Sequence, residues 1–342
     1  GKDMHKSWGN AIWFDDAAEK MGVDVMRWMY ASQNPEHNLL FGYAYADEVR
    51  KNLITLWNTY YFFITYANLD GFNPIEVQVK DDDYTILDKW ILSKMNEFVK
   101  ISHDYYTSFQ IHKLMKEASI ILDSLSNWYV RRNRRRFWKS ENDNDKNAAY
   151  MTLYNSLLIY VKVLSPIIPF VTEDIYRNLV MNIGGSEFDS IHLNSFPEYD
   201  KTKTEEQLIA EIDNLINIVN LGRSARSKSK IKVRQPLASI SIFSSNQDAI
   251  ESILKNCEQI KEELNVKSVK ILDQIDDILE YEIKPNFSNL RSRFGDDMNK
   301  SISEINKLDA GLIMQNLESE NVFVTIDGHD YPITENDLVI TE

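Results

Sequence analysis

The chain has 342 residues and a formal net charge of −14, from 38 Lys and Arg against 52 Asp and Glu. By bulk charge alone it is not a nucleic-acid-binding protein, so such a function would have to rest on local clusters of cations. Hydrophobic residues make up 43% of the chain, which excludes intrinsic disorder; the length predicts two or three domains.

Glycine and proline are scarce, with 11 and 8 residues, and this favours long helices. The sequence has no glycine-rich phosphate-binding motif, which counts against a complete nucleotide-binding domain. Cys257 is the only cysteine, so an internal disulfide framework and a cysteine-based zinc site are excluded and a reducing, cytoplasmic location is expected. The histidines have no metal-binding spacing, so we predict no metal site. The most apolar stretch, 157–171, is too short for a membrane span.

Helical periodicity dominates the first 180 residues. Apolar residues recur every three or four positions in six segments, and Asp15 and Asp16 are expected to supply N-cap side chains for the first of them. The segments are 17–30, 43–68, 84–103, 110–138, 148–164 and 170–180. They predict a mainly α fold built on an antiparallel helical bundle.

The pattern changes towards the C-terminal end. A polar hinge near 198–206 leads into a helix expected over 205–225, and after Pro236 apolar residues alternate with a period of two. We expect strands at 237–244 and 266–272 flanking a helix at 247–264, and a terminal hairpin of 321–326 with 331–340 around Asp327-Gly328. A small α+β domain therefore follows the bundle.

The opening residues, GKDMHKSWGN, form a polar loop that enters a helix. Lys6 and Ser7 present an ammonium and a hydroxyl, and a flexible ammonium can follow negative charge as it develops on a phosphate. The alternative is a solvated basic terminus, and a motif this short does not by itself exclude it.

An arginine-rich segment, LSNWYVRRNRRRFWK at 125–139, holds six cations among nine residues, which repel one another on a helix. Leu125 and Tyr129 continue into Arg132 and Arg136 at steps of about four. The face that is core in the first half of the helix is therefore expected to become cationic in the second.

Aromatic residues accompany these arginines, and guanidinium groups with interleaved rings are typical of RNA recognition. The alternative is internal pairing with acidic residues, namely Glu141, Asp143, Asp145, Glu173 or Asp174. The sequence leaves both interpretations open, and each can hold for different members of the cluster. The candidate RNA contacts are Trp128, Arg131, Arg132, Arg135 and Arg136.

A second basic segment, GRSARSKSKIKVRQPL, covers 222–237. Alternation would place Lys228, Lys230, Lys232 and Arg234 on one side of an extended segment, as a ladder that fits a phosphate backbone. A solvated interdomain linker is the alternative. The candidate RNA contacts here are Lys230, Lys232 and Arg234.

Together these features resemble class I aminoacyl-tRNA synthetases, most closely the isoleucyl-tRNA synthetases. The opening DMHKSWGN is similar to the family's K-M-S-K-S-x-G-N loop. The remaining motifs follow the family's order: the G-x-D-x-x-R residues Gly22, Asp24 and Arg27, WYVRRNRRRFW (128–138), SPIIPFVTEDIY (165–176), IHLNSFPE (191–198), IKVRQPL (231–237) and KPNFSNLRSRFGDDM (284–298). The last motif resembles the C-terminal extension of the eukaryote-like branch.

The resemblance implies an ATP-binding role for Met4, His5, Lys6 and Ser7. Lys6 matches the motif's second lysine, which stabilises the ATP phosphates, and so is the expected catalytic residue. Asp3 stands where the motif has its first lysine and His5 where it has serine, so the motif is incomplete there, although Lys2 is one residue away.

The resemblance also implies four parts. Residues 1–30 are the signature loop and connecting helix, 31–200 the anticodon-binding bundle, 201–235 a basic linker helix and extended segment, and 236–342 an acidic α+β domain. Through Arg234 the chain has 29 basic and 31 acidic residues, and beyond it 9 and 21. The acidic domain is therefore expected to face away from tRNA or to serve in packing.

The family's other ATP motif, most of its nucleotide-binding sheet and its editing domain are expected upstream. The fragment alone is then inactive and holds no cofactor, whereas the full-length isoleucine–tRNA ligase uses ATP with Mg²⁺. The expected partners are isoleucine tRNA, through its anticodon stem and loop, and the upstream domains, without a membrane. A valyl or leucyl relative is the nearer alternative, and a helical protein-interaction scaffold without RNA binding is the distant one.

Overall fold

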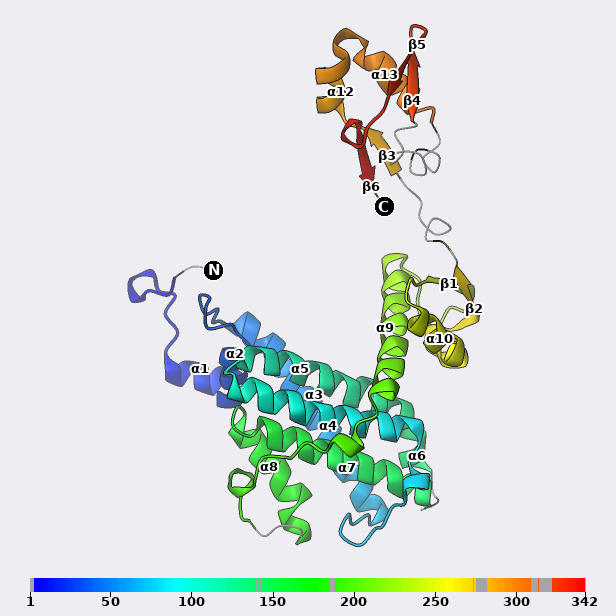
Figure 1. Ribbon diagram of the computed structural model, residues 1–342. Helices are drawn as coiled ribbons and strands as arrows, with labels where there is room; N and C mark the ends of the chain where they lie inside the picture. The colour runs from blue at the N-terminus through cyan, green and yellow to red at the C-terminus, as the bar shows by residue number, and fades with distance from the viewer. Residues whose placement is uncertain are drawn as a thin grey trace. The chain divides into compact units, whose positions relative to one another are not determined.

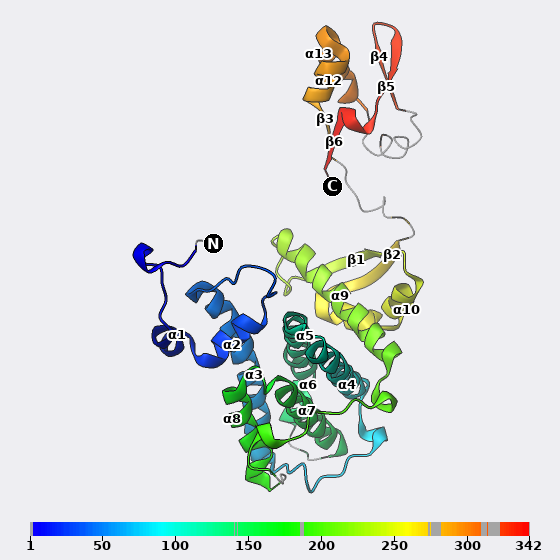
Figure 2. The ribbon, with the colours of Figure 1, turned by 60° about the vertical axis from the view of Figure 1, so that its left-hand side comes forward.

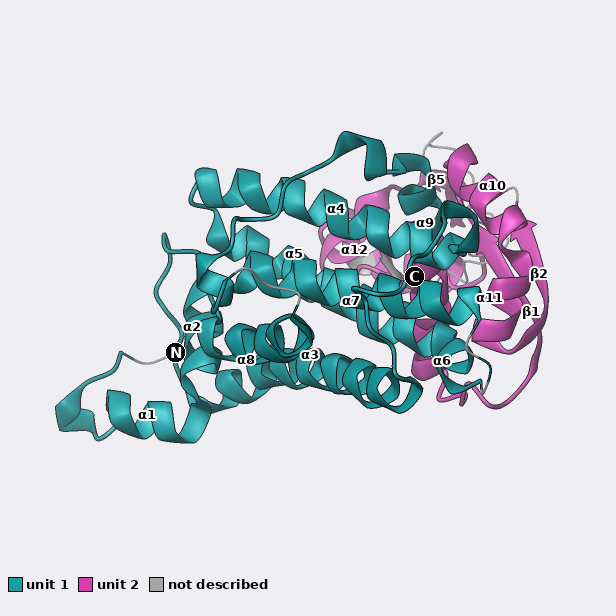
Figure 3. Ribbon diagram, turned by 90° about the horizontal axis from the view of Figure 1, so that it is seen from below, with its two compact units in different colours: residues 1–212 teal, residues 213–342 magenta. Residues whose placement is uncertain are grey.

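The computed structural model describes residues 3–139, 141, 143–184, 188–272, 274, 282–308, 313 and 322–341. The chain divides into two compact units, residues 1–212 and 213–342, which Figure 3 shows in different colours. Among the described residues, no helix is both long enough and apolar enough to cross a membrane.

The first unit is a bundle of helices (Figure 1), so the predicted mainly α fold is confirmed. Its helices are α1 (Phe14–Met21), α2 (Val23–Ala31), α3 (Tyr43–Asp70), α4 (Ile86–Thr107), α5 (Ile111–Asp123), α6 (Arg131–Trp138), α7 (Asn144–Leu164) and α8 (Pro169–Leu179). Single turns connect them, namely η1 (Lys6–Trp8), η2 (Asp81–Asp83), η4 (Met181–Ile183), η5 (Ile191–Leu193) and η6 (Lys201–Lys203).

The bundle core lies where α4, α5 and α7 meet. Trp90 and Met95 from α4, Leu114 from α5 and Leu157 from α7 are all fully buried. Burial of each such side chain contributes about 1.5–3 kcal/mol, so these helices anchor the elements around them. Aromatic rings extend the core towards α6, because Phe137 contacts Phe62 of α3 and Tyr150 of α7, with ring centroids 5.2 and 5.1 Å apart.

The expected first helix is divided at a glycine. Gly22 has φ 88°, a value that glycine adopts readily, and it separates α1 from α2. The expected N-cap residues Asp15 and Asp16 lie inside the first turn of α1, and Trp13 occupies the cap position. The charge of both carboxylates still favours that end of the helix.

The second unit begins within α9 (Glu206–Lys228), which continues to a β-α-β element (Figure 2). Strands β1 (Leu237–Phe243) and β2 (Val266–Leu272) pair in parallel, with Leu237 opposite Val266. The helix expected between them is two helices, α10 (Gln247–Lys255) and α11 (Cys257–Leu264), because the backbone of Asn256 leaves the helical conformation. Gly222 of α9 allows close packing, since a Cβ there would lie 2.4 Å from Leu264 Cδ1.

The remaining elements are β3 (Glu282–Pro285), α12 (Phe287–Phe294), η8 (Gly295–Asp297), α13 (Met298–Ile305), β4 (Phe323–Ile326), β5 (His329–Pro332), η9 (Glu335–Asp337) and β6 (Leu338–Thr341). The predicted turn at Asp327-Gly328 is confirmed, because both residues have positive φ and join β4 to β5. The expected second strand, 331–340, is wrong: it divides into β5 and β6, and β6 pairs with β3 instead. Residue 321 of the expected first strand lies outside the described residues.

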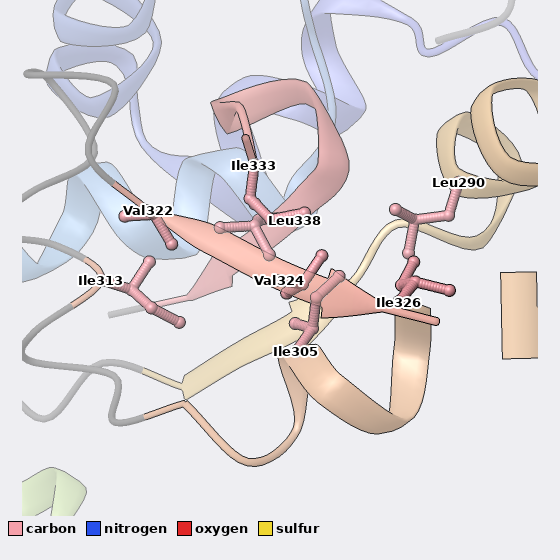
Figure 4. Packing of buried hydrophobic residues seen from close by; sticks show 8 residues of the cluster. All are labelled: Leu290, Ile305, Ile313, Val322, Val324, Ile326, Ile333 and Leu338. Atoms are coloured by element: carbon pink, nitrogen blue, oxygen red, sulfur yellow. The ribbon is translucent and has the colours of Figure 1, made fainter. Parts of the chain in front are cut away.

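These C-terminal elements enclose an apolar cluster of their own (Figure 4). Leu290 of α12, Ile305 of α13 and Val324 and Ile326 of β4 belong to it, each at most 4% exposed. The pairing of β6 with β3 is explained by this burial, because Leu338 at the start of β6 joins the same cluster.

Candidate nucleotide loop and nucleic-acid interface

The opening loop is closed by one asparagine side chain. The backbone N–H of His5 donates to Asn10 Oδ1 at 2.9 Å, and Asn10 Nδ2 donates to the carbonyl of Asp3 at 2.9 Å. The turn η1 lies between them and ends at Gly9, which has φ 67°. The loop is therefore held in shape by its own residues, although every side chain from Asp3 to Asn10 is exposed.

The loop presents Lys6 and Ser7 together. The Lys6 ammonium lies 4.6 Å from the centroid of the exposed Trp13 ring, a cation–π contact that orients the side chain without neutralising its charge. The sulfur of Met4 accepts the N–H of Ile12 at 3.5 Å, so Met4 ties the loop to the approach to α1. An exposed ammonium and hydroxyl on one turn fit the oxygens of a phosphate group. Lys2 lies outside the described residues.

The G-x-D-x-x-R residues join α2 to the linker between α7 and α8. Asp24 Oδ2 accepts the N–H of Val171 at 2.7 Å, at the N-terminal end of α8. Arg27 donates to the carbonyls of Ile167 and Pro166 at 2.7 and 2.8 Å, just beyond the C-terminal end of α7. Each charge thus lies at the helix end that favours it. Burial raises the pKa of Asp24, and the hydrogen bonds from α8 oppose that rise.

Removing the Asp24 carboxylate is expected to lower the free energy of unfolding by about 0.5–2 kcal/mol, the usual cost of losing an N-cap acceptor. Urea unfolding of Asp24→Ala measures it. Asp15→Ala is the matched control, because Asp15 is exposed in the first turn of α1. Equal stability of the two variants would show that Asp24 does not hold α8.

The core face of the arginine-rich segment does not become cationic, contrary to the expectation. A π-helical turn, η3 (Ser124–Val130), separates α5 from α6. Within α6 the buried positions are Asn133 and Phe137, at 5% and 1% exposure, rather than Arg132 and Arg136. The core face therefore continues along α6, and the cations lie beside it or opposite it.

Arg136 is a structural residue. Its Nη1 lies 2.8 Å from Oδ1 of Asp88, which is fully buried, and its Nη2 donates to the carbonyl of Asp145 at 2.7 Å. Burial disfavours the guanidinium charge, but the hydrogen bond to Asp88 and the nearby negative charges of Asp88 and Asp145 together outweigh this and raise the pKa of Arg136. The Arg136 guanidinium is therefore committed to internal pairing, the alternative interpretation, and the predicted RNA contact does not hold for this arginine.

Asp88 is the partner that the sequence did not reveal. It also accepts the Tyr129 hydroxyl at 2.5 Å and the N–H of Thr85 at 2.8 Å. Burial, with the Asp88 charge beside it, raises the pKa of Tyr129. Thr85 and Asp88 form a capping box at the start of α4, and the T-x-x-D spacing is typical of such a cap. Local sequence contains no signal for the ion pair across 48 residues.

The acidic residues nearer in sequence are also paired internally. Asp145 Oδ1 lies 2.7 Å from Arg136 Nε. Lys139 Nζ lies 2.7 Å from both Asp143 Oδ2 and Asp145 Oδ2. Glu173 pairs with Arg177 at 2.9 Å and accepts the N–H of Ile191 at 2.9 Å. The last contact joins the motif at 165–176 to the motif at 191–198, so both belong to the scaffold of the bundle.

The predicted RNA contact does not hold for Trp128 either. Its side chain is 4% exposed, so its ring is not available for stacking on a base. The guanidinium groups of Arg132 and Arg131 lie 5.2 and 5.9 Å from the ring centroid. Trp128 therefore makes cation–π contacts that orient these two guanidinium groups. The exposed ring of the segment is Trp138, with the Arg134 guanidinium 6.0 Å from its centroid.

We define the cationic face as Arg131, Arg134, Arg135 and Trp138, which are all exposed. Their spacing of three and four residues places them along one side of α6. Like charges at these spacings repel by about 0.2–0.5 kcal/mol per pair, so a bound anion would stabilise this helix. Arg132, also a candidate, is half-buried beside Trp128.

The expected basic ladder is not extended. Residues 228–236, which we call the basic turn, begin with Lys228 at the end of α9. Lys230 has φ 57°, and the N–H of Gln235 donates to the carbonyl of Lys232 at 3.0 Å, closing a further turn. The chain reverses here because α9 must return to β1. The side chains of Lys228, Lys230, Lys232 and Arg234 are all exposed.

Comparison with known proteins first defines a class. Residues 88–242 match the model of the anticodon-binding domain of tRNA ligases, so the chain carries such a domain from α4 into β1.

The chain is similar to isoleucine–tRNA ligases. The chain is 38% identical over 99% of its length to isoleucine–tRNA ligase of Clostridium novyi and 36% identical over its whole length to that of Clostridium tetani; each match covers 33% of the relative. It is 41% identical over 79% of its length to the enzyme of Dehalococcoides mccartyi strain CBDB1, covering 27% of that relative. The chain thus spans about a third of the relatives it matches. The predicted resemblance to isoleucyl-tRNA synthetases is confirmed.

Proposed function

We propose that the chain is the tRNA-binding portion of an isoleucine–tRNA ligase. The observation that carries this proposal is the cationic face, three exposed arginines and an exposed tryptophan along one side of α6, within the matched anticodon-binding domain. Arginines bind phosphate oxygens in a bidentate way, and an exposed indole can stack on an unpaired base. The anticodon loop of a tRNA offers both groups.

The opening loop would serve the chemical step. In the longer enzyme, the isoleucine carboxylate attacks the α-phosphate of ATP, so that an aminoacyl adenylate forms and pyrophosphate leaves. A tRNA ribose hydroxyl then displaces AMP. Negative charge moves onto the departing pyrophosphate, and the exposed Lys6 ammonium, with Ser7 beside it, is suited to binding that charge as it develops.

The hydrogen bonds of Asp24 and Arg27 would fix the position from which the opening loop extends, because they attach α2 to the rest of the bundle. The proposed partners are isoleucine tRNA and the catalytic and editing domains of the same polypeptide. We propose ATP with Mg²⁺ as a substrate of the whole enzyme, and a cytoplasmic location.

Arg131→Gln/Arg135→Gln is expected to weaken binding of isoleucine tRNA. The negative slope of log affinity against log salt is expected to become shallower by about two, because each lost phosphate contact reduces its magnitude by about 0.9. Titration of the chain with the tRNA transcript at several salt concentrations measures both quantities. Lys51→Gln is the control. Lys51 is exposed in the first turns of α3, away from α6, because the part of α3 that contacts α6 lies further along the helix at Phe62. An unchanged slope in the double variant would refute an RNA contact by these arginines.

The same titration separates the alternatives. Isoleucine tRNA with its own anticodon is expected to bind more tightly than a version with a swapped anticodon. Tighter binding of valine or leucine tRNA would instead favour the neighbouring ligases, whose bundles share these motifs. No binding of any tRNA at low salt would favour a protein-interaction scaffold.

A further inference from the structure

One lysine in the basic turn has a backbone conformation that disfavours it. Lys230 has φ 57°, in the left-handed region. The other non-glycine residues with positive φ in the described part of the chain are Phe109, Asn265 and Asp327. Asn and Asp tolerate this region because their short side chains bond to nearby backbone, but lysine gains no such compensation.

The position of Lys230 in the chain is one where glycine is usual. The N–H of Ile231 donates to the carbonyl of Arg226 at 2.8 Å, and the N–H of Lys230 donates to that of Ser227 at 3.0 Å. This pair of bonds is a Schellman motif, which ends α9 and requires a left-handed residue directly after the cap. Lys230 occupies that place at a cost to folding.

Arg226 holds the turn in this shape. Its side chain is 5% exposed, and it donates to four carbonyls. Two belong to the turn, those of Lys232 and Gln235 at 3.2 and 3.0 Å. Two belong to the junction of α11 and β2, those of Leu264 and Asn265 at 2.6 and 3.1 Å. The cation of Arg226 is therefore committed to the backbone.

Asn265 fixes the other half of the turn. Its Nδ2 donates to the carbonyls of Val233 and Arg234 at 3.0 and 3.1 Å, and its own backbone is left-handed at φ 49°. Two side chains thus over-determine the turn, which is the condition under which a strained residue persists.

The Lys230 side chain contributes no burial to offset the strain, because it is exposed. Its ammonium is therefore the group that accounts for a lysine here. Lys228, Lys232 and Arg234 are exposed around it, and the sequence of the turn contains no aromatic residue. Long cations without rings suit a phosphate backbone rather than bases.

We propose that the basic turn is a preformed site for the phosphate backbone of RNA, with Lys230 as a contact and Arg226 and Asn265 as positioning residues. This inference rests on the proposed tRNA function and extends it to a site that binds without reading sequence. The site acts in addition to the cationic face of α6, and its contribution is the same for cognate and swapped anticodons.

Lys230→Gly tests whether Lys230 binds RNA, because its effects on stability and on tRNA affinity are expected to have opposite signs. Glycine relieves the strain, so the urea midpoint of unfolding is expected to rise. The variant is also expected to bind tRNA about three- to tenfold more weakly, and the negative slope of log affinity against log salt is expected to become shallower by about one. Lys230→Asn is expected to lose affinity equally, and Lys230→Arg to retain it. The probes are isoleucine tRNA and its anticodon-swapped version.

Asn265→Gly tests the positioning role. Glycine keeps the left-handed backbone and removes both bonds to the turn, so affinity is expected to fall while the salt slope stays unchanged, because every cation remains. A Lys230→Gly variant with higher stability but wild-type affinity and slope would overturn the inference. If Arg131→Gln/Arg135→Gln still weakened binding in that case, the proposed function would stand without it. Failure of the unsubstituted chain to bind either RNA would overturn both.

Discussion

In the proposed full-length ligase, Lys6→Met is expected to lower kcat for isoleucine activation by about 100- to 1,000-fold, the usual effect of removing one group that stabilises transition-state charge. The Lys6 ammonium is exposed beside Ser7 and oriented by the Trp13 ring, so it can move onto the pyrophosphate as charge develops. Isoleucine-dependent exchange of pyrophosphate into ATP measures this step.

Two variants make the Lys6 result specific. Lys20→Met removes another exposed lysine, one that lies near Tyr43 on the adjoining helix, and is expected to leave kcat unchanged. Lys6→Arg keeps the charge and is expected to retain part of the activity. The affinity for tRNA is expected to be the same in all three. A Lys6→Met enzyme with wild-type exchange would show that the opening loop does not act in activation.

Asp88→Ala is expected to lower the free energy of unfolding by about 3–5 kcal/mol, because it removes the buried carboxylate and leaves the Arg136 guanidinium with only the partly exposed Asp145, 2.7 Å from its Nε. Asp88 is fully buried and is the common acceptor for Tyr129, Thr85 and Arg136. Urea unfolding followed by circular dichroism provides the measurement.

Arg135→Gln is the matched control, since Arg135 adjoins Arg136 but is exposed; a change within about 0.5 kcal/mol is expected. Asp88→Ala/Arg136→Met is expected to recover part of the loss, because it also removes the guanidinium charge that has lost its buried partner. If Asp88→Ala cost less than 1 kcal/mol, the ion pair would not anchor the arginine-rich helix, and the assignment of Arg136 to structure would be wrong.

The sequence by itself determined the helices of the bundle and the class of the protein. Apolar periodicity placed α3, α4, α7 and α8 within a few residues of their observed bounds, because each buries one face along its length and local spacing reports that burial. The β-α-β order after Pro236 was equally legible from the change to alternation. Motif order indicated the ligase family, since it depends on residue identity rather than on contacts.

Tertiary structure alone decided which cations are available. A π turn altered the face that α6 presents, and a carboxylate 48 residues away took Arg136 into the interior. In the second unit, Arg226 donates to four carbonyls from two segments and holds a predicted extended segment in a turn. Strand β6 pairs with β3 because Leu338 shares a core with α12 and α13. Each outcome depends on partners distant in sequence, and residue spacing carries no record of them.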